Sequence, residues 1–222
     1  MSLPSSPRSL RFPLLDLDEQ VEAFASRWPA ARAADDGCSF LAAAAPARLR
    51  LPLAGPRAVP GERIGDYAER LPGAAELQLV LLLQAGAMAL GCWRGDELLE
   101  HKAVRRYVVR GSGRAQPTHL KTRGKSRYGS RLRLQNWRRL LVDTNRRLTE
   151  SVERLGEPDR VFFAVPVRAW SELFAADPPP PFARDAALLQ RIPMHVHRPD
   201  HGELLRVRAW LCHGRLELPP PA

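Results

Sequence analysis

The chain has 222 residues, of which 45% are apolar, 34 are Lys or Arg and 24 are Asp or Glu. This length and apolar content favour a globular protein with one substantial core and an appendage. No apolar run is long enough to cross a bilayer, which excludes a membrane-spanning helix. We also expect no membrane partner. Three scattered cysteines indicate buried thiols in a cytoplasmic protein rather than a disulfide framework.

The positive charge is concentrated in one part of the chain. Fifteen of the 34 Lys and Arg residues lie between His101 and Arg147, where Asp143 is the one acid, so this segment carries a net charge of about +14. The remaining residues sum to a slightly negative charge. A basic segment on an otherwise mildly acidic protein indicates docking of a polyanion, most often a nucleic acid. The alternative is a solvated basic loop.

The sequence pattern of the first third of the chain, residues 1–72, predicts a small α+β lobe. Residues 1–13, interrupted by prolines and arginines, are expected to be a flexible leader without a signal peptide. Leu17–Trp28 has the apolar spacing of an amphipathic helix. Ser39–Leu53 is expected to form short strands and Ile64–Leu71 a short helix, with a boundary at Pro72-Gly73.

The order of strand and helix patterns in residues 73–218 predicts a second domain with an α/β fold. Leu77–Leu83, Ala87–Trp93 and Glu97–Val109 read as three antiparallel strands. A helix over Leu132–Leu155 follows, ended by Gly156. The remaining pattern predicts a strand at Arg160–Val165, a helix at Arg168–Phe174, a strand at Leu189–Val196 and a helix at Gly202–His213. Three antiparallel strands followed by α-β-α-β-α indicate an RNase H-like mixed sheet.

The connection between the third strand and the long helix, residues 110–130, is too long for an ordinary loop and is expected to be functional. Glycines at 111 and 113 allow the backbone to approach a partner closely. The segment is rich in bases suited to phosphates. We expect it to be mobile in the free protein and to become ordered on RNA.

Three segments in this region resemble a known family: His101–Arg110, Gly113–Gln116 and Ser126–Asn136. They are similar to the VLRF family of release-factor-like peptidyl-tRNA hydrolases of ribosome quality control. That family is related to the catalytic domain of the eukaryotic and archaeal class-one termination factor, which has an RNase H-like core. This chain departs from the family pattern at Leu134-Gln135, at Trp137 and on both sides of Gln116.

The resemblance implies that Gln116 is the catalytic glutamine. An amide is not a general base, but it can position water and stabilise a developing oxyanion while the RNA handles the proton. The residues expected to shape the loop are Gly111, Gly113, Gly129 and Asn136. The residues expected to bind RNA are Arg105, Arg106, Arg110, Arg114, Lys121, Arg123, Lys125, Arg127, Arg131 and Arg133.

Other sites are weaker. His195 and His197, with His201 and Cys212, could begin a metal site, but the spacing fits no zinc module. A two-metal nuclease would need a carboxylate in the first strand, and Leu77–Leu83 has none. We therefore expect no metal and no cofactor.

The sequence thus predicts a cytoplasmic enzyme, monomeric off the ribosome, that releases nascent chains from stalled large ribosomal subunits. Its expected partners are the large ribosomal subunit, peptidyl-tRNA and ribosomal RNA. The alternative is a non-catalytic RNA- or ribosome-binding factor with the same fold. Loss of Gln116 would abolish activity in the enzyme, whereas a binding factor would tolerate it.

Overall fold

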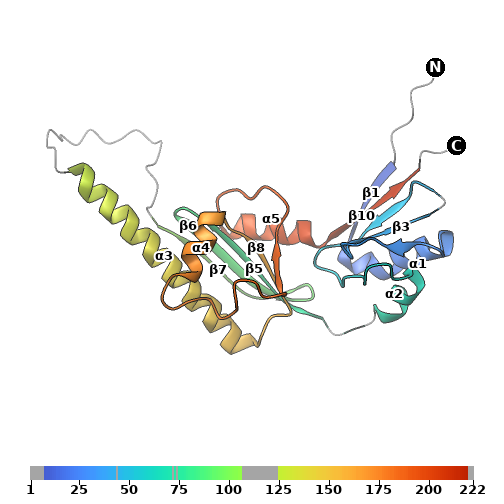
Figure 1. The fold of residues 1–222 in the computed structure, drawn as a ribbon, viewed down its shortest axis with the longest axis horizontal. Helices are drawn as coiled ribbons and strands as arrows, with labels where there is room; N and C mark the ends of the chain where they lie inside the picture. The colour runs from blue at the N-terminus through green and yellow to red at the C-terminus, as the bar shows by residue number, and fades with distance from the viewer. Residues whose placement is uncertain (1–7, 44, 72, 74, 107–124, 220–222) are drawn as a thin grey trace, which may run out of the picture. The chain divides into compact units, whose positions relative to one another are not determined.

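The computed structural model describes residues 8–43, 45–71, 73, 75–106 and 125–219, with side chains in the last range described from residue 131. The chain divides into two compact units. Unit 1 comprises residues 1–74 and 207–222, and unit 2 comprises residues 75–206. Figure 1 shows one five-stranded sheet in each unit.

Unit 1 is a small α+β lobe whose sheet runs β1-β10-β4-β3-β2. Its elements are β1 (Arg8–Pro13), a 3₁₀ turn η1 (Leu14–Asp16), α1 (Leu17–Arg27), β2 (Arg32–Ala33), β3 (Ser39–Leu41), β4 (Arg48–Arg50), α2 (Ile64–Arg70) and β10 (His213–Leu218). The predicted helical face of α1 is confirmed for Leu17, Val21 and Phe24, which are buried. They pack in one core with Phe40 and Tyr67, whose rings lie 5.1 Å apart.

Two expectations about this lobe are wrong. Residues 8–13 are not a leader, because β1 pairs antiparallel with β10 along its whole length. The predicted second domain, residues 73–218, includes the segment that forms β10, yet β10 pairs with β1 and β4 in unit 1. Phe12 lies opposite Gly214 in this pairing, and the Phe12 ring fills the space that a Cβ on residue 214 would need. An aromatic ring over a strand glycine is a recognised way to stabilise such a pair.

Unit 2 has a mixed sheet in the order β7-β6-β5-β8-β9. Its elements are β5 (Leu77–Gln84), β6 (Ala87–Arg94), β7 (Glu97–Arg105), α3 (Lys125–Leu155), β8 (Arg160–Ala164), α4 (Val167–Phe174) and β9 (Leu189–Arg191), and α5 (His201–Leu211) begins in it. The predicted meander is confirmed, since β6 is antiparallel to both β5 and β7. The strand β8 is parallel to β5, and β9 is parallel to β8.

The central strand β5 explains why this part of the sequence is so apolar. Seven of its eight residues are buried, because it lies between β6 and β8 and is covered on both faces. Leu79, Leu81 and Leu83 share one face and pack with the helix residues Leu140 and Leu148. On the other side of the sheet, Leu204 of α5 approaches Gly91 of β6 so closely that a Cβ there would touch it.

Three element boundaries differ from the sequence prediction. The helix α3 starts at Lys125, seven residues before the predicted Leu132. The strand predicted over Leu189–Val196 covers only Leu189–Arg191, because Pro193 has no N–H with which to continue the ladder. The helix predicted to reach His213 ends at Leu211 and is followed by the unpredicted strand β10. The strand β7 ends at Arg105, and its predicted extension to Val109 lies outside the described residues.

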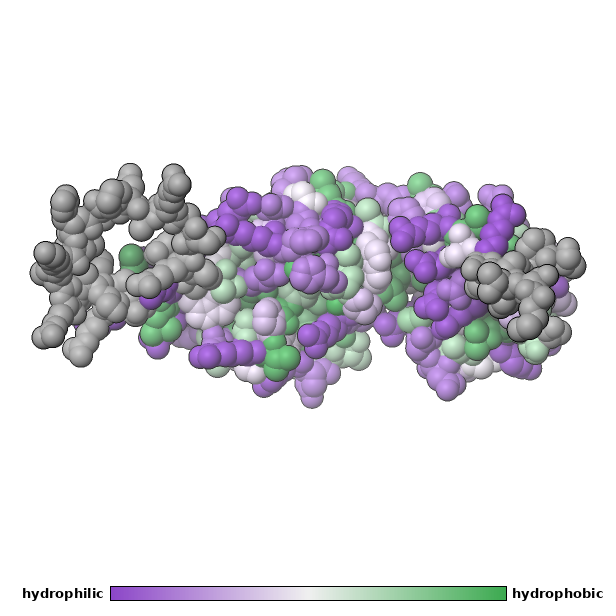
Figure 2. Space-filling view, turned by 90° about the horizontal axis from the view of Figure 1, so that it is seen from above, coloured by the Kyte–Doolittle hydropathy of each residue, from purple (hydrophilic) through white to green (hydrophobic). Residues whose placement is uncertain are grey.

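On the face in view in Figure 2, apolar areas are scattered among hydrophilic side chains. Among the described helices, none is both long and apolar enough to cross a membrane.

Candidate functional site

The predicted site surrounds the end of β7 and the beginning of α3. The segment that joins these two elements carries Arg110, Gly111, Gly113, Arg114, Gln116, Lys121 and Arg123, and all of these lie outside the described residues. Lys125, Arg127 and Gly129 fall in the first turns of α3, where only the backbone is described. The described part of the site is therefore its two ends, namely β7 up to Arg106 and α3 from Arg131.

At the end of β7, both arginines that were expected to bind RNA are engaged by carboxylates. Arg105 donates to Asp200 at 2.7 Å, in an exposed ion pair. Arg106 donates to Asp143 of α3, and both side chains are about one-third exposed. The backbone N–H of Arg106 also donates to the carbonyl of Gly86 at 2.8 Å. Arg106 is thus attached both to the β5–β6 turn and to α3.

Asp200 has two roles in this arrangement. It accepts a hydrogen bond from the backbone N–H of Glu203 at 2.9 Å, at the start of α5. That bond, followed by the charge of Arg105, lowers the pKa of Asp200. The ionised carboxylate is therefore favoured both as an N-terminal cap and as a partner of Arg105.

The exposed face of α3 carries an arginine stripe, which we define as Arg131, Arg138, Arg139 and Arg146. All four are exposed, and they lie opposite the buried residues Leu140, Thr144 and Leu148. Arg131, Arg138 and Arg146 are seven and eight residues apart, which places them on one face of the helix at 3.6 residues per turn. Arg133 and Asn136 are half-buried and both have interaction partners.

The charge on this helix opposes its own dipole. The first turn of α3 contains no acid, and no acid occurs before Asp143. Bases near a helix N-terminus are unfavourable for the isolated helix, because that end already carries a partial positive charge. The same arrangement is favourable for an anion that lies along the helix. The stripe begins at Arg131, beyond the first turn of α3, so this dipole effect concerns the bases before it.

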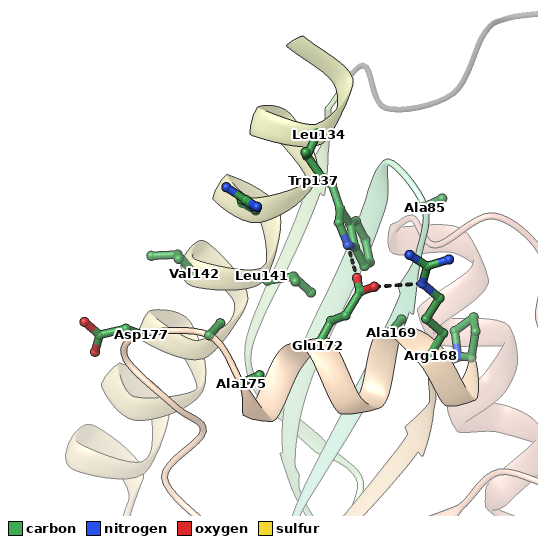
Figure 3. A pocket seen from close by; sticks show the side chains of 13 residues that line it. Ala85, Leu134, Trp137, Leu141, Val142, Arg168, Ala169, Glu172, Ala175 and Asp177 are labelled. Carbon is green, nitrogen blue, oxygen red and sulfur yellow. Dashed lines mark hydrogen bonds and ion pairs between the residues drawn. The ribbon is translucent and has the colours of Figure 1, made fainter. Parts of the chain in front are cut away.

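A groove lies between α3 and α4, and Arg138 of the stripe is among the residues that line it. It has a volume of about 780 Å³ and is lined mainly by apolar side chains, among them Leu134, Trp137, Leu141 and Ala169. Figure 3 shows the carboxylate of Glu172 between the indole of Trp137 and the guanidinium of Arg168. The Trp137 N–H donates to Glu172, and Arg168 Nε donates to it at 2.9 Å.

These contacts fix the position of Trp137. The hydrogen bond from Trp137, followed by that from Arg168, lowers the pKa of Glu172, so the carboxylate stays ionised. On the next turns of α3, the buried Asn145 donates to the carbonyls of Leu173 and Pro178 at 2.9 and 2.7 Å. The side-chain bonds from α3 to α4 and the segment after it hold the two helices together on one face of the sheet.

The histidines do not form a metal site in the described part of the chain, where no group of three potential ligands lies close enough to hold an ion. His195 and His197 lie outside any strand, with ring centroids 5.1 Å apart. The backbone N–H of His197 donates to Glu203 at 2.5 Å, and Arg206 holds the same carboxylate. Arg206, and then His197, lower the pKa of Glu203 to about 2. This carboxylate is thus already used in the fold.

Two features of this site were missed by sequence reasoning. The first is the arginine stripe, which the 3.6-residue spacing of the basic positions in α3 would have distinguished from the buried face of the helix. In contrast, the pairs Arg106–Asp143 and Trp137–Glu172 join residues 37 and 35 positions apart, and no local pattern reveals them.

Comparisons with known proteins identify the family. Residues 78–217 match the family described as bVLRF1, Bacteroidetes VLRF1 release factor. A mouse (Mus musculus) protein named tRNA endonuclease ANKZF1 is 33% identical over 158 residues, which is 69% of this chain and 21% of that protein. The chain thus spans about a fifth of the length of this curated relative.

A solved structure, the Vms1 mitochondrial localization core, is similar with a TM-score of 0.50 and 14% identity, over 94% of this chain and 82% of that one. At this identity the likeness concerns the fold alone. The family match covers well over half of the chain, including β5–β7, α3 and the segment with Gln116. The resemblance read from the sequence is therefore confirmed, and the chain belongs to the VLRF1 release-factor family.

Proposed function

We propose that this protein is a cytoplasmic, ribosome-associated peptidyl-tRNA hydrolase that releases nascent chains from stalled large ribosomal subunits. The observation that carries the proposal is the match to a release-factor family across residues 78–217, which includes Gln116 and its basic flanks. In this proposal the protein acts as a monomer that binds peptidyl-tRNA and ribosomal RNA, without a metal or cofactor.

The proposed chemistry is hydrolysis of the ester between the nascent peptide and the terminal ribose of the tRNA. Water adds to the ester carbonyl, the ribose oxygen leaves with a proton, and the peptide leaves with a free carboxylate. Gln116 would position the water and donate a hydrogen bond to the developing oxyanion. The glycines at 111, 113 and 129 would allow the backbone to come close to the RNA.

The RNA-binding surface in this proposal combines the bases of the 110–130 segment with the arginine stripe. Arg131, a member of the stripe, is also among the residues that the sequence predicts to bind RNA. Arg105 and Arg106, which the sequence predicts to bind RNA, are left out of this surface because each already pairs with a carboxylate. The remaining bases would contribute affinity by releasing counterions from the RNA, and this affinity should fall steeply with salt.

We further propose that unit 2 has an RNase H-like topology. Its support is the strand order β7-β6-β5-β8-β9, in which β6 runs opposite to the other four strands. A metal-dependent nuclease of that fold would carry a carboxylate on the central strand, and β5 reads LQLVLLLQ.

The name of the mouse relative suggests a second activity, cleavage of tRNA. One assay separates the two. Peptidyl-tRNA labelled in the peptide and at the tRNA 3′ end is bound to isolated large subunits and mixed with the protein. Ester hydrolysis yields an unmodified peptide and a tRNA with an intact 3′ end. Phosphodiester cleavage leaves nucleotides on the peptide.

The decisive variant is Gln116→Ala, with Gln20→Ala in unit 1 as the matched control. We expect Gln116→Ala to reduce the single-turnover rate by a factor on the order of 10²–10³, typical of losing one oxyanion donor. Affinity for the subunit should be nearly unchanged. Full release by Gln116→Ala would refute the assigned role. If wild type and Gln116→Ala both bind the subunit and neither releases peptide, the result would favour the non-catalytic ribosome-binding factor.

A further inference from the structure

The helices α1 and α2 cover one face of the unit 1 sheet (Figure 1). On that face, Phe12, Phe40 and Leu49 pack with the two helices in the core of the unit. Successive strand residues point to opposite faces of a sheet, so the neighbours of these core residues point outward. Arg11 of β1 and Arg50 of β4 are two such neighbours, and both are exposed. The sheet therefore has a second, outer face that begins with these arginines.

Three arginines lie side by side on this outer face. In the strand register, Arg11 of β1 pairs with Arg215 of β10, and Arg215 pairs with Arg50 of β4. All three are exposed. Neighbouring strands are about 4.8 Å apart, so the row spans about 10 Å of backbone. Because the three residues are far apart in the sequence, a count of charge along the chain does not reveal the row.

The row is unfavourable in the free protein. Like charges directly opposite one another on neighbouring strands destabilise a sheet. Glu217 neutralises one member, since it accepts a hydrogen bond from Arg50 Nε at 2.8 Å. Among the described residues, no carboxylate pairs with Arg11 or Arg215. An anion bound across the row would offset the repulsion between these two arginines.

The outer face is also basic beyond this row. In the next row, Glu217 lies opposite Arg48, and Leu41 lies between Arg48 and Arg32. Arg63 extends this row, because it bridges Arg32. Over the described strands of unit 1 the face carries one acid and five arginines, a net charge of about +4. We define the sheet face by these five arginines, Arg11, Arg32, Arg48, Arg50 and Arg215.

The composition of the sheet face fits a phosphate backbone better than a protein or a membrane. Protein interfaces depend on buried aromatic or aliphatic anchors, and binding to a membrane surface depends on apolar side chains that enter the lipid. Among the described strand residues of this face, Leu41 is the one large apolar side chain. Guanidinium groups donate paired hydrogen bonds to phosphate oxygens. The partner indicated by these side chains is therefore a nucleic acid.

We infer that the sheet face binds the phosphate backbone of the tRNA. The inference rests on the proposed function, in which the protein holds two RNAs, the large subunit and a peptidyl-tRNA. The arginine stripe belongs to unit 2, whereas the sheet face belongs to unit 1, which has its own core. Contacts with a few phosphates give weak binding, which suits a product that must leave after each reaction. The ester end of the same tRNA adds affinity, because two linked sites bind more tightly than either site alone.

The experiment measures binding of the full chain to two probes between 50 and 200 mM salt. One probe is fluorescently labelled deacylated tRNA, and the other is vacant large ribosomal subunits. The variant is Arg11→Gln, Arg50→Gln and Arg215→Gln. Loss of three phosphate contacts should lower the slope of log affinity for tRNA against log salt by about 2–3, and the affinity near 0.15 M salt by roughly 10²-fold. Affinity for vacant large subunits should be nearly unchanged.

The matched control is Arg8→Gln, Arg27→Gln and Arg57→Gln, which removes three exposed arginines of unit 1 that lie outside the sheet face. It should bind tRNA as wild type does. The sheet-face variant should melt at the wild-type temperature or above it, because opposed like charges are removed. If the triple variant does not fold, Arg215→Gln alone removes the central arginine and should still lower the slope by about 0.7–0.9.

The outcomes separate this inference from the proposed function. Unchanged tRNA affinity in the folded sheet-face variant, with peptide release by wild type, would overturn the inference and leave the proposed function standing. An equal loss in the control variant would also overturn it, because total charge would then explain the binding. A loss for vacant large subunits as great as that for tRNA would overturn the assignment to tRNA. A loss of tRNA binding confined to the sheet-face variant, in a protein that releases no peptide, would support the inference and overturn the proposed function.

Discussion

The arginine stripe of α3 allows a quantitative prediction about RNA binding. We consider the triple variant Arg131→Gln, Arg138→Gln and Arg146→Gln. These side chains are exposed and lie on one face of the helix over 15 residues, or about 22 Å at 1.5 Å per residue. An extended RNA backbone can therefore contact all three. Glutamine has nearly the helix propensity of arginine, so the fold should be retained.

The magnitude follows from counterion release. Each neutralised phosphate contributes about 0.7–0.9 to the slope of log affinity against log salt. Removal of three contacts should reduce that slope by about 2–3. Near 0.15 M salt, the same relation gives a loss of roughly 10²-fold in affinity.

The assay is binding of fluorescently labelled protein to purified large ribosomal subunits between 50 and 200 mM salt. The matched control is Arg8→Gln, Arg11→Gln and Arg215→Gln, which removes three exposed arginines from unit 1. Both variants lower the net charge by the same amount, so only the location differs. An unchanged slope in the stripe variant, or equal losses in both variants, would refute the stripe as the docking surface.

Three further predictions concern stability. Trp137→Phe removes the N–H that binds Glu172 and should lower the free energy of unfolding by about 1–2 kcal/mol, measured in urea; a variant as stable as wild type would contradict the geometry in Figure 3. Gly214→Ala places a Cβ inside the ring of Phe12 and should lower the free energy of unfolding by about 1–3 kcal/mol. An unchanged melting temperature would argue against the β1–β10 pairing. The pKa of Glu203 is lowered from 4.5 to about 2, chiefly by Arg206, so the stability that its ionised carboxylate contributes is complete above pH 4.5 and is lost as the pH falls towards 2. The difference in free energy of unfolding between wild type and Glu203→Gln should therefore narrow between pH 4.5 and 2. A difference that stayed constant over this range would exclude a stabilising role for the ionised Glu203.

Several elements of the fold could be predicted because their cause is local. The strands β5, β6 and β7 are continuous apolar or alternating segments separated by tight turns, and Gly95 takes the positive φ of 58° that the second turn requires. The buried face of α3 follows from the spacing of Trp137, Leu140 or Leu141, Thr144 and Leu148. The family resemblance was equally local, since it rested on short segments around 101–136.

The candidate site was predictable in composition but not in its contacts. The sequence indicated a basic face and a glutamine in a glycine-rich segment. It also predicts that Arg105 and Arg106 bind RNA, because a guanidinium in a basic segment suits a phosphate. The structure gives each of them a carboxylate partner, one from α3 and one from the start of α5. Charge counted along the chain does not reveal which bases are already neutralised in space.

The central strands, the amphipathic helices and the concentration of charge could be predicted without a structure, because each follows from the order of neighbouring side chains. The pairing of Arg8–Pro13 with His213–Leu218, about 200 residues later, and the contact between Asp143 and Arg106 depend on the folded chain. A short edge strand carries little local preference of its own, and its pairing is selected by the apolar surface and hydrogen bonds that a distant partner completes. An ion pair between distant elements likewise depends on how the sheet and helix pack, which no spacing along the chain specifies.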